Sequence, residues 1–332
     1  FIGYQAGAAT TEQSLHTAIG HRALASHNAN AASSQSGNTA VGWGSMMDST
    51  SAYNTTAVGK ESMENSVDGY NNTMIGYYAA HDGFQSGNGH DNVGMGPQCF
   101  NSATSANYNI GIGGQALEDL TTGDYNTVGG WQAGMNITEG GGNTVLGYYA
   151  YSQATTGEHN IAIGNGAMSV GVTTGDNNVC VGRNAGNSLT GSENTFVGKY
   201  AGYNNTSGDN NVCLGHEAGK GQMTTHSDLL YIARGPEGSG NAACWIHGAS
   251  NGDVSNGTNS SSWTTYSDQR LKKNITDNTD GLSIIDNVKV RNFKYKQYNA
   301  TPEVLYTSSD TIPSGKAVGD VKTAKSWSPV AS

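Results

Sequence analysis

The chain has 332 residues, of which 48 are glycine and only 13% are charged, with a net charge of −10. The low charged fraction argues against intrinsic disorder, and the acidic balance argues against nucleic acid as a partner, because phosphate contacts need clustered lysine and arginine. No apolar run approaches about 18 residues, so the sequence predicts no membrane-spanning helix. The charge is uneven, since residues 1–266 carry 6 basic and 19 acidic side chains and residues 267–332 carry 10 and 7. We therefore expect two regions of different character.

A short phrase recurs from the first residues onward, and because the chain opens on Phe1 within a copy, we interpret it as a fragment. Each copy places Asn, three residues, Gly, two variable residues and then Ala, as in NNVCVGRNAG and ENTFVGKYAG. A fixed short period is typical of stacked repeats, so residues 1–235 are predicted to form an all-β parallel β-roll or β-solenoid of about 13 rungs. The glycine of each copy, which we call the marker glycine, recurs mostly every 17 residues, at Gly3, Gly20, Gly42, Gly59, Gly76, Gly96, Gly113, Gly130, Gly147, Gly164, Gly182, Gly198 and Gly215.

Within each rung, the residues around the marker glycine predict a short strand followed by a bend. The residues one and three positions before the glycine are mostly Val, Ile, Leu or Thr, such as Ile161 and Ile163, and this period of two predicts that they face the core. The residue between them is mostly small or apolar, such as Ala162 or Cys180, and we expect that face to be covered by another subunit. The glycine permits a sharp bend. An alanine three residues later, such as Ala185, is small enough to close a narrow core.

The repeat pattern resembles the left-handed β-roll heads of trimeric autotransporter adhesins and, more closely, the N-T-x-x-G-x-x-A-G arrays of phage tail-fibre proteins. The resemblance covers roughly residues 1–235. It implies a parallel homotrimer whose three rolls pack around a common axis. Spacing alone indicates only a stacked solenoid.

Two insertions, Ser26–Gly37 and Ala80–Asp91, lengthen the return connection that follows the alanine. They are predicted to project from one side of the rod and to form its contact surface. Aromatic residues that follow the marker glycine have two interpretations, a glycan-binding surface or, preferably, packing against a neighbouring rung or subunit. The main ones are Tyr4, Trp43, Tyr77, Trp131, Tyr148 and Tyr200.

The repeat region offers no pattern from which we predict a metal, a cofactor or an active site. The pairs His81-Asp82 and His90-Asp91 match no common ligand spacing and are interpreted as solvated loop residues. A solenoid enzyme that acts on polysaccharide is disfavoured, because the acidic residues of the repeats are isolated. Examples are Glu139, Glu158 and Glu193.

The sharpest motif lies beyond a connector at residues 236–266, where residues 267–275 read SDQRLKKNI. This segment resembles the opening S-D-x-R-[LI]-K-x-N-I of the intramolecular chaperone domain of the S74 peptidase family. That domain stands at the C-terminus of phage tailspikes, endosialidases and tail fibres. The resemblance implies a small α+β chaperone region over residues 267–332, which is shorter than the family usually has.

In that family a serine and a lysine form a catalytic dyad. The resemblance assigns Ser267 as the nucleophile and Lys272 as its base. The reaction would be a single self-cleavage of the Tyr266–Ser267 bond, in cis, after the trimer has assembled. No enzyme activity on an external substrate is expected.

Together, the repeats and the C-terminal motif favour an extracellular structural protein, most simply a phage tail fibre for host attachment on the virion surface. Its expected partners are further copies of the same chain and a host cell-surface receptor, for which a glycan is one candidate. The alternative is a secreted bacterial surface adhesin or extracellular filament subunit built from the same parts.

Overall fold

The computed structural model describes residues 1–10, 15–27, 37–85, 89–221, 223–235, 244–256, 304–305 and 321–322. The chain divides into two compact units, residues 1–264 and 265–332. Within the described residues there are strands and turns but no helix, and so no helix that is long and apolar enough to cross a membrane. Most of the described residues belong to the first unit.

The first unit is a ladder of very short strands. Its strands are β1 (Thr17–Ile19), β2 (Thr39–Val41), β3 (Thr56–Val58), β4 (Thr73–Ile75), β5 (Val93–Met95), β6 (Ile110–Ile112), β7 (Thr127–Gly129), β8 (Thr144–Leu146), β9 (Ile161–Ile163), β10 (Val179–Val181), β11 (Thr195–Val197), β12 (Val212–Leu214), β13 (Leu230–Ala233), β14 (Cys244–Gly248) and β15 (Val254–Asn256). In the second unit, β16 (Val304–Leu305) and β17 (Val321–Lys322) form an antiparallel pair. Each rung contributes one strand to the ladder.

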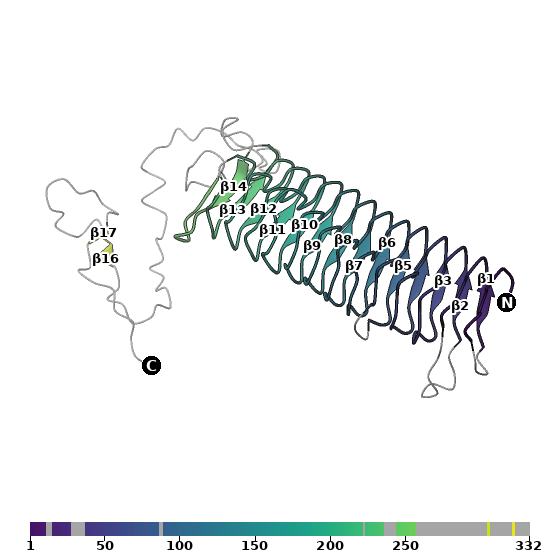
Figure 1. Ribbon diagram of the computed structural model, residues 1–332. Coiled ribbons are helices and arrows are strands. Elements are labelled where there is room, and N and C mark those ends of the chain that lie inside the picture. Colours follow the sequence, from purple (N-terminus) through teal and green to yellow (C-terminus); the bar gives the residue numbers. More distant parts are fainter. Residues whose placement is uncertain are drawn as a thin grey trace, which may run out of the picture. The chain divides into compact units, whose positions relative to one another are not determined.

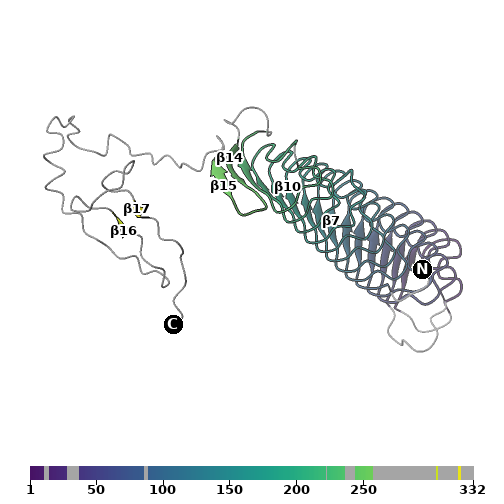
Figure 2. The ribbon, with the colours of Figure 1, turned by 90° about the vertical axis from the view of Figure 1, so that its left-hand side faces the viewer.

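Consecutive rungs pair in parallel and in register from β1 to β13, so the strands line up along one elongated stack (Figures 1 and 2). Thr39, Ala40 and Val41 of β2, for example, lie beside Thr56, Ala57 and Val58 of β3. At the C-terminal end of the ladder the direction reverses, and β14 and β15 pair antiparallel. The predicted β-solenoid with a period of about 17 residues is confirmed, because a fixed period places each residue beside its equivalent in the next rung.

The two strand faces are the reverse of those expected from the sequence. The middle residue of each strand faces the core, and Ala40, Ala162 and Phe196 are all fully buried. The flanking residues face outward, and Ile110 and Ile112 are 40% and 48% exposed. Both faces are apolar, so hydrophobicity did not distinguish them. The size of the middle residue does not distinguish them either, because it ranges from Gly111 to Phe196 along the ladder.

The core volume is shared between the middle residue of the strand and the residue four positions after the marker glycine. On the rung of Gly96 the strand residue is Gly94, and a Cβ there would lie 3.0 Å from Cδ2 of buried Phe100. Near the C-terminal end the large and the small residue exchange positions. Phe196, in the strand, fills the core, and the residue four positions after the marker glycine is Gly202, where a Cβ would overlap the Phe196 ring. The alanines three positions after the marker glycine, including Ala185, are fully buried, as predicted.

The marker glycines adopt backbone angles that only glycine tolerates. Gly59 has φ of +145°, and a Cβ at this position would overlap the carbonyl oxygen of Gly76 on the next rung. The same holds along the stack from Gly3 to Gly198. The predicted bend is therefore confirmed, and a second reason for glycine is the close approach of neighbouring backbones.

A ladder of buried asparagines explains the Asn that begins each copy. Asn126 donates from its backbone N–H to Oδ1 of Asn109 at 2.8 Å, and from Nδ2 to the same oxygen and to the Gly140 carbonyl. Asn143 repeats these three bonds, to Asn126 Oδ1 and the Gly157 carbonyl. Stacked identical amides satisfy one another in the interior, where an unpaired polar group is costly. The buried members are Asn38, Asn72, Asn92, Asn109, Asn126, Asn143, Asn160, Asn178, Asn194 and Asn211.

Candidate functional site

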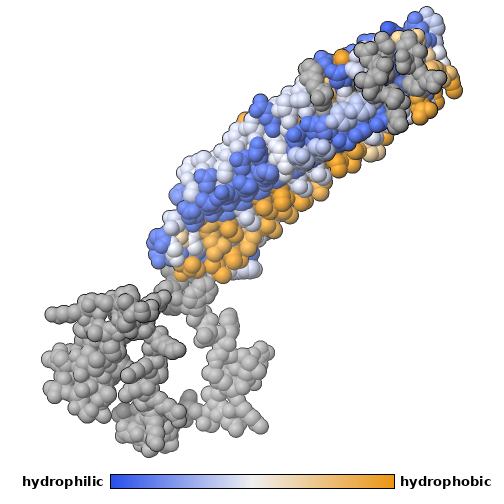
Figure 3. Space-filling view, turned by 90° about the horizontal axis from the view of Figure 1, so that it is seen from below, coloured by the Kyte–Doolittle hydropathy of each residue, from blue (hydrophilic) through white to orange (hydrophobic). Residues whose placement is uncertain are grey.

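The first functional surface is the outer strand face, which we define as the first and third residues of β1 to β12. Its side chains are Val, Ile, Leu, Met and Thr, with one Gly, so it carries no charge. The most exposed apolar members are Ile19, Met95, Ile110, Ile112, Leu146 and Val197, at 38% to 48%. Figure 3 shows apolar residues gathered in a band along the stack, beside a polar surface. An exposed apolar band of this kind is a candidate interaction surface.

Aromatic and basic side chains stack along the position directly after the marker glycine. Tyr4 stacks on His21 at 5.4 Å between ring centroids, and His21 stacks on Trp43 at 6.0 Å. Nζ of Lys60 then lies 5.3 Å from the Trp43 ring and 5.5 Å from the Tyr77 ring. Of the six aromatics singled out in the sequence, Tyr200 is half-buried, and the exposed ones are Tyr4, Trp43, Tyr77, Trp131 and Tyr148. The column combines ring stacking with cation–π contacts.

A second aromatic ladder, which the sequence analysis did not identify, lies at the entry to the strands. Its members are one rung apart, and neighbouring ring centroids lie 4.5 to 5.1 Å from each other. They are Tyr53, Tyr70, His90, Tyr108 and Tyr125. The first three stand six residues before their marker glycine and the last two stand five before it, so alignment on that glycine alone does not place them in one column.

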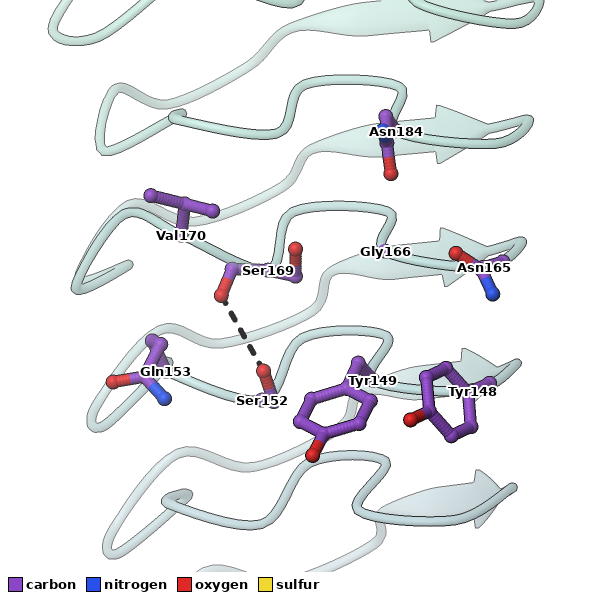
Figure 4. Close-up of a pocket in the computed structure, with 9 residues that line it drawn as sticks. All are labelled: Tyr148, Tyr149, Ser152, Gln153, Asn165, Gly166, Ser169, Val170 and Asn184. Carbon is purple, nitrogen blue, oxygen red and sulfur yellow. Dashed lines mark hydrogen bonds between the residues drawn. The ribbon is translucent and has the colours of Figure 1, made fainter.

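A hollow of about 530 Å³ opens on the surface beside Tyr148 and Tyr149 (Figure 4). Its floor includes Ser152, whose Oγ donates to the Ser169 carbonyl at 3.3 Å. The remaining lining residues are Gln, Asn, Gly and Val, so no carboxylate, imidazole or ammonium group lines it. Burial, followed by the neighbouring Tyr149, raises the pKa of Tyr148, so its hydroxyl stays neutral at pH 7. The hollow therefore has polar groups for contact but no acid or base for catalysis.

One cluster of ligand-type side chains lies on the rungs of Gly59 and Gly76. Glu61, Glu64 and His81 each place one ligand atom within 4.8 Å of the other two. The expectation that His81 is a solvated loop residue is wrong, because only 17% of its side chain is exposed and its Nε2 lies 3.1 Å from Glu64 Oε2. Glu64 and His81 are five residues after their marker glycines, and this shared repeat position was the signal in the sequence.

The predicted catalytic pair, Ser267 and Lys272, lies outside the described residues, as do residues 28–36 and 86–88 of the two insertions. The α+β character expected of residues 267–332 likewise falls mostly outside them. In the repeats, Glu139, Glu158 and Glu193 are exposed on separate rungs. No pair of these carboxylates forms a glycosidase-like site.

Comparison with known proteins adds one family. Residues 267–309 match the model of the peptidase S74 family, described as the chaperone of endosialidase. No curated protein and no solved structure matches the chain. The resemblance recognised in SDQRLKKNI is therefore confirmed. A β-solenoid followed by this segment fits a tail-fibre-like structural protein with a C-terminal chaperone domain.

Proposed function

We propose that the chain forms the shaft of a homotrimeric phage tail fibre that serves host attachment. The observation that carries this proposal is the uncharged, apolar outer strand face, repeated in register along the ladder. An apolar band on one chain is complementary to the same band on a parallel copy, because equal rung spacing keeps the two in register over their whole length. Three copies around one axis bury all three bands.

Charge favours the same arrangement. Residues 1–266 carry 6 basic and 19 acidic side chains, so copies of this region repel one another wherever charged surfaces meet. Association through the outer strand face keeps these charges on the outside, where water and salt screen them. The polar surface, the aromatic column and the insertions at residues 26–37 and 80–91 then remain available for contact with a host receptor.

The C-terminal region acts as a trimerisation chaperone in this proposal. Parallel solenoids depend on contacts between chains that must start in the same register, and a domain that sets the register reduces misassembly. After assembly, the Ser267 hydroxyl attacks the Tyr266 carbonyl carbon while Lys272 accepts its proton. The Tyr266–Ser267 peptide bond breaks, the Ser267 amine leaves with the proton, and water hydrolyses the resulting ester. The chaperone is released and the fibre stays assembled.

The test is intact mass under denaturing conditions, combined with light scattering of the native protein, on the gene expressed to its natural stop codon. The wild type should give two fragments that meet at Tyr266 and Ser267, and the native shaft should have three times the chain mass. Ser267→Ala and Lys272→Ala should remain uncut but still trimeric. A single full-length mass in the wild type contradicts the cleavage, and a monomeric shaft contradicts the fibre.

A further inference from the structure

The Glu61, Glu64 and His81 cluster holds a buried carboxylate oxygen that the protein does not satisfy. The Glu61 side chain is only 8% exposed, and its Oε1 lies 3.3 Å from Lys60 Nζ. The Tyr78 hydroxyl also interacts with this carboxylate, but the other oxygen, Oε2, is buried and accepts no hydrogen bond that meets geometric criteria from the described residues. A buried acceptor without a donor is unfavourable, so this atom points to a positively charged group that completes the site.

The charges around the cluster also attract a cation. Glu61 and Glu64 lie close together, Asp48 is near enough for its charge to act on Glu64, and Asp82 contacts His81. Lys60 is the basic side chain that contacts Glu61. Four carboxylates thus surround one ammonium and one imidazole, which leaves the cluster negatively charged when the carboxyl groups are ionised.

His81 is oriented as metal-binding histidines are. Its Nδ1 lies 3.0 Å from Oδ1 of Asp82, and its ring stacks on Tyr78 at 4.4 Å between centroids. When Nδ1–H donates to Asp82, the lone pair of Nε2 is directed at Glu64, 3.1 Å away. A carboxylate that holds the far nitrogen of a histidine fixes its tautomer and strengthens it as a ligand.

The backbone of the stack fixes all three residues. The N–H of Glu61 donates to the Trp43 carbonyl at 2.8 Å. The carbonyls of Glu64 and His81 each accept from a backbone N–H of the preceding rung, those of Asp48 and Asn65. Gly44 lies next to the carboxylates, and a Cβ there would come within 3.3 Å of Cγ of Glu61. The three ligands therefore belong to a rigid scaffold, and a small residue leaves room beside them.

From this geometry we propose that Glu61, Glu64 and His81 bind one divalent transition-metal ion per chain, with Zn²⁺ as the probe ion. One imidazole nitrogen and two carboxylate oxygens form a donor set that Zn²⁺ accepts, and water completes its coordination. The ion joins the rung of Gly59 to the rung of Gly76 and neutralises the buried carboxylates. Because it binds only the folded stack, it stabilises the N-terminal half of the shaft.

The test uses the full chain, stripped of metal with EDTA and then titrated with ZnCl₂ at pH 7.5 by calorimetry. Dialysis and elemental analysis give the stoichiometry. We expect one Zn²⁺ per chain in the wild type and a loss of at least 10-fold in affinity in His81→Gln and Glu64→Gln. Asp82→Asn, which leaves the ligands in place, should lower the affinity by about 10- to 100-fold.

The matched control is His159→Gln, the same substitution at an exposed histidine several rungs away. It should bind Zn²⁺ as the wild type does, and Zn²⁺ should raise the melting temperature of both but not that of His81→Gln. Circular dichroism of the metal-free variants checks that they fold, and Glu61→Gln gives a nearly isosteric second variant. The proposal is overturned if the wild type takes up no stoichiometric Zn²⁺, or if His81→Gln and Glu61→Gln bind it as tightly as His159→Gln. In either case the cluster is an ion pair without a metal.

Discussion

The asparagine ladder offers the sharpest test of how the stack is stabilised, through the substitution Asn126→Ala. The change removes the acceptor of the Asn143 backbone N–H, and it removes the donor to the Gly140 carbonyl. Both partners stay buried, since Asn143 is 1% exposed and Gly140 is also buried. An orphaned buried polar group costs about 1–3 kcal/mol. Two of them together give an expected loss of about 4 kcal/mol in the free energy of unfolding.

The assay is urea unfolding monitored by circular dichroism at fixed chain concentration, together with hydrogen exchange of the native protein. Asn126→Ala should lower the urea midpoint, and the Asn143 amide should exchange faster because it has lost its acceptor. The control is Asn165→Ala on the exposed surface, which should change stability by no more than about 0.5 kcal/mol. If the two variants unfold alike, or if the Asn143 amide stays equally protected, the ladder does not stabilise the stack as argued.

Three further predictions concern the backbone, the outer strand face and acid sensitivity. Gly59→Ala should lower the free energy of unfolding by more than about 3 kcal/mol, because a Cβ would overlap the next rung. Gly252→Ala, which has open space around the Cβ, should lower it by about 1 kcal/mol. Urea unfolding midpoints of the two variants test this difference. Ile112→Asp places a charge on the outer strand face, so light scattering should give a native mass below that of a trimer. Circular dichroism should show that the strand ladder is intact. An unchanged trimer would exclude the outer strand face as the interface. Burial, followed by the charge of a neighbouring histidine, lowers the pKa of His16 to about 4. In the unfolded chain His16 takes up a proton below about pH 6.5, whereas in the folded chain it does so only near pH 4. The free energy of unfolding therefore falls as the pH decreases from about 6.5 to about 4. Limited proteolysis at pH 7 and pH 4.5 should show opening of the N-terminal rungs at the lower pH. His16→Asn, which can still accept the bond from the Asn38 N–H, should lessen this opening, while His27, whose pKa burial also lowers, accounts for the remainder.

The repeat itself determined the fold class. A 17-residue period fixes which residues lie beside one another in successive rungs, so a parallel, in-register ladder follows from spacing alone. The marker glycines and the buried alanines were also predictable, because a sharp bend and a narrow core each admit one kind of side chain. The C-terminal motif SDQRLKKNI led to the chaperone family for a similar reason, since several fixed positions in a short segment are specific.

The tertiary structure decided which strand face is the core. Ile161 and Ile163 are more hydrophobic than Ala162, yet the isoleucines face outward and the alanine is buried. Hydrophobicity ranks single residues, whereas the interior of a rung has a fixed volume that the strand and the following turn must share, as Gly94 and Phe100 do. This sharing depends on contacts across the rung and is not visible in the alternation of one strand.

The same distinction applies to the sites. The sequence by itself determined the repeat, its period and the chaperone motif, because these are properties of residues in order along the chain. Only the folded stack brought Glu61, Glu64 and His81 within one coordination distance and left Glu61 Oε2 without a partner. Residues 17 positions apart become neighbours when rungs stack, so chemistry that is dispersed along the sequence is assembled by the coil of the solenoid.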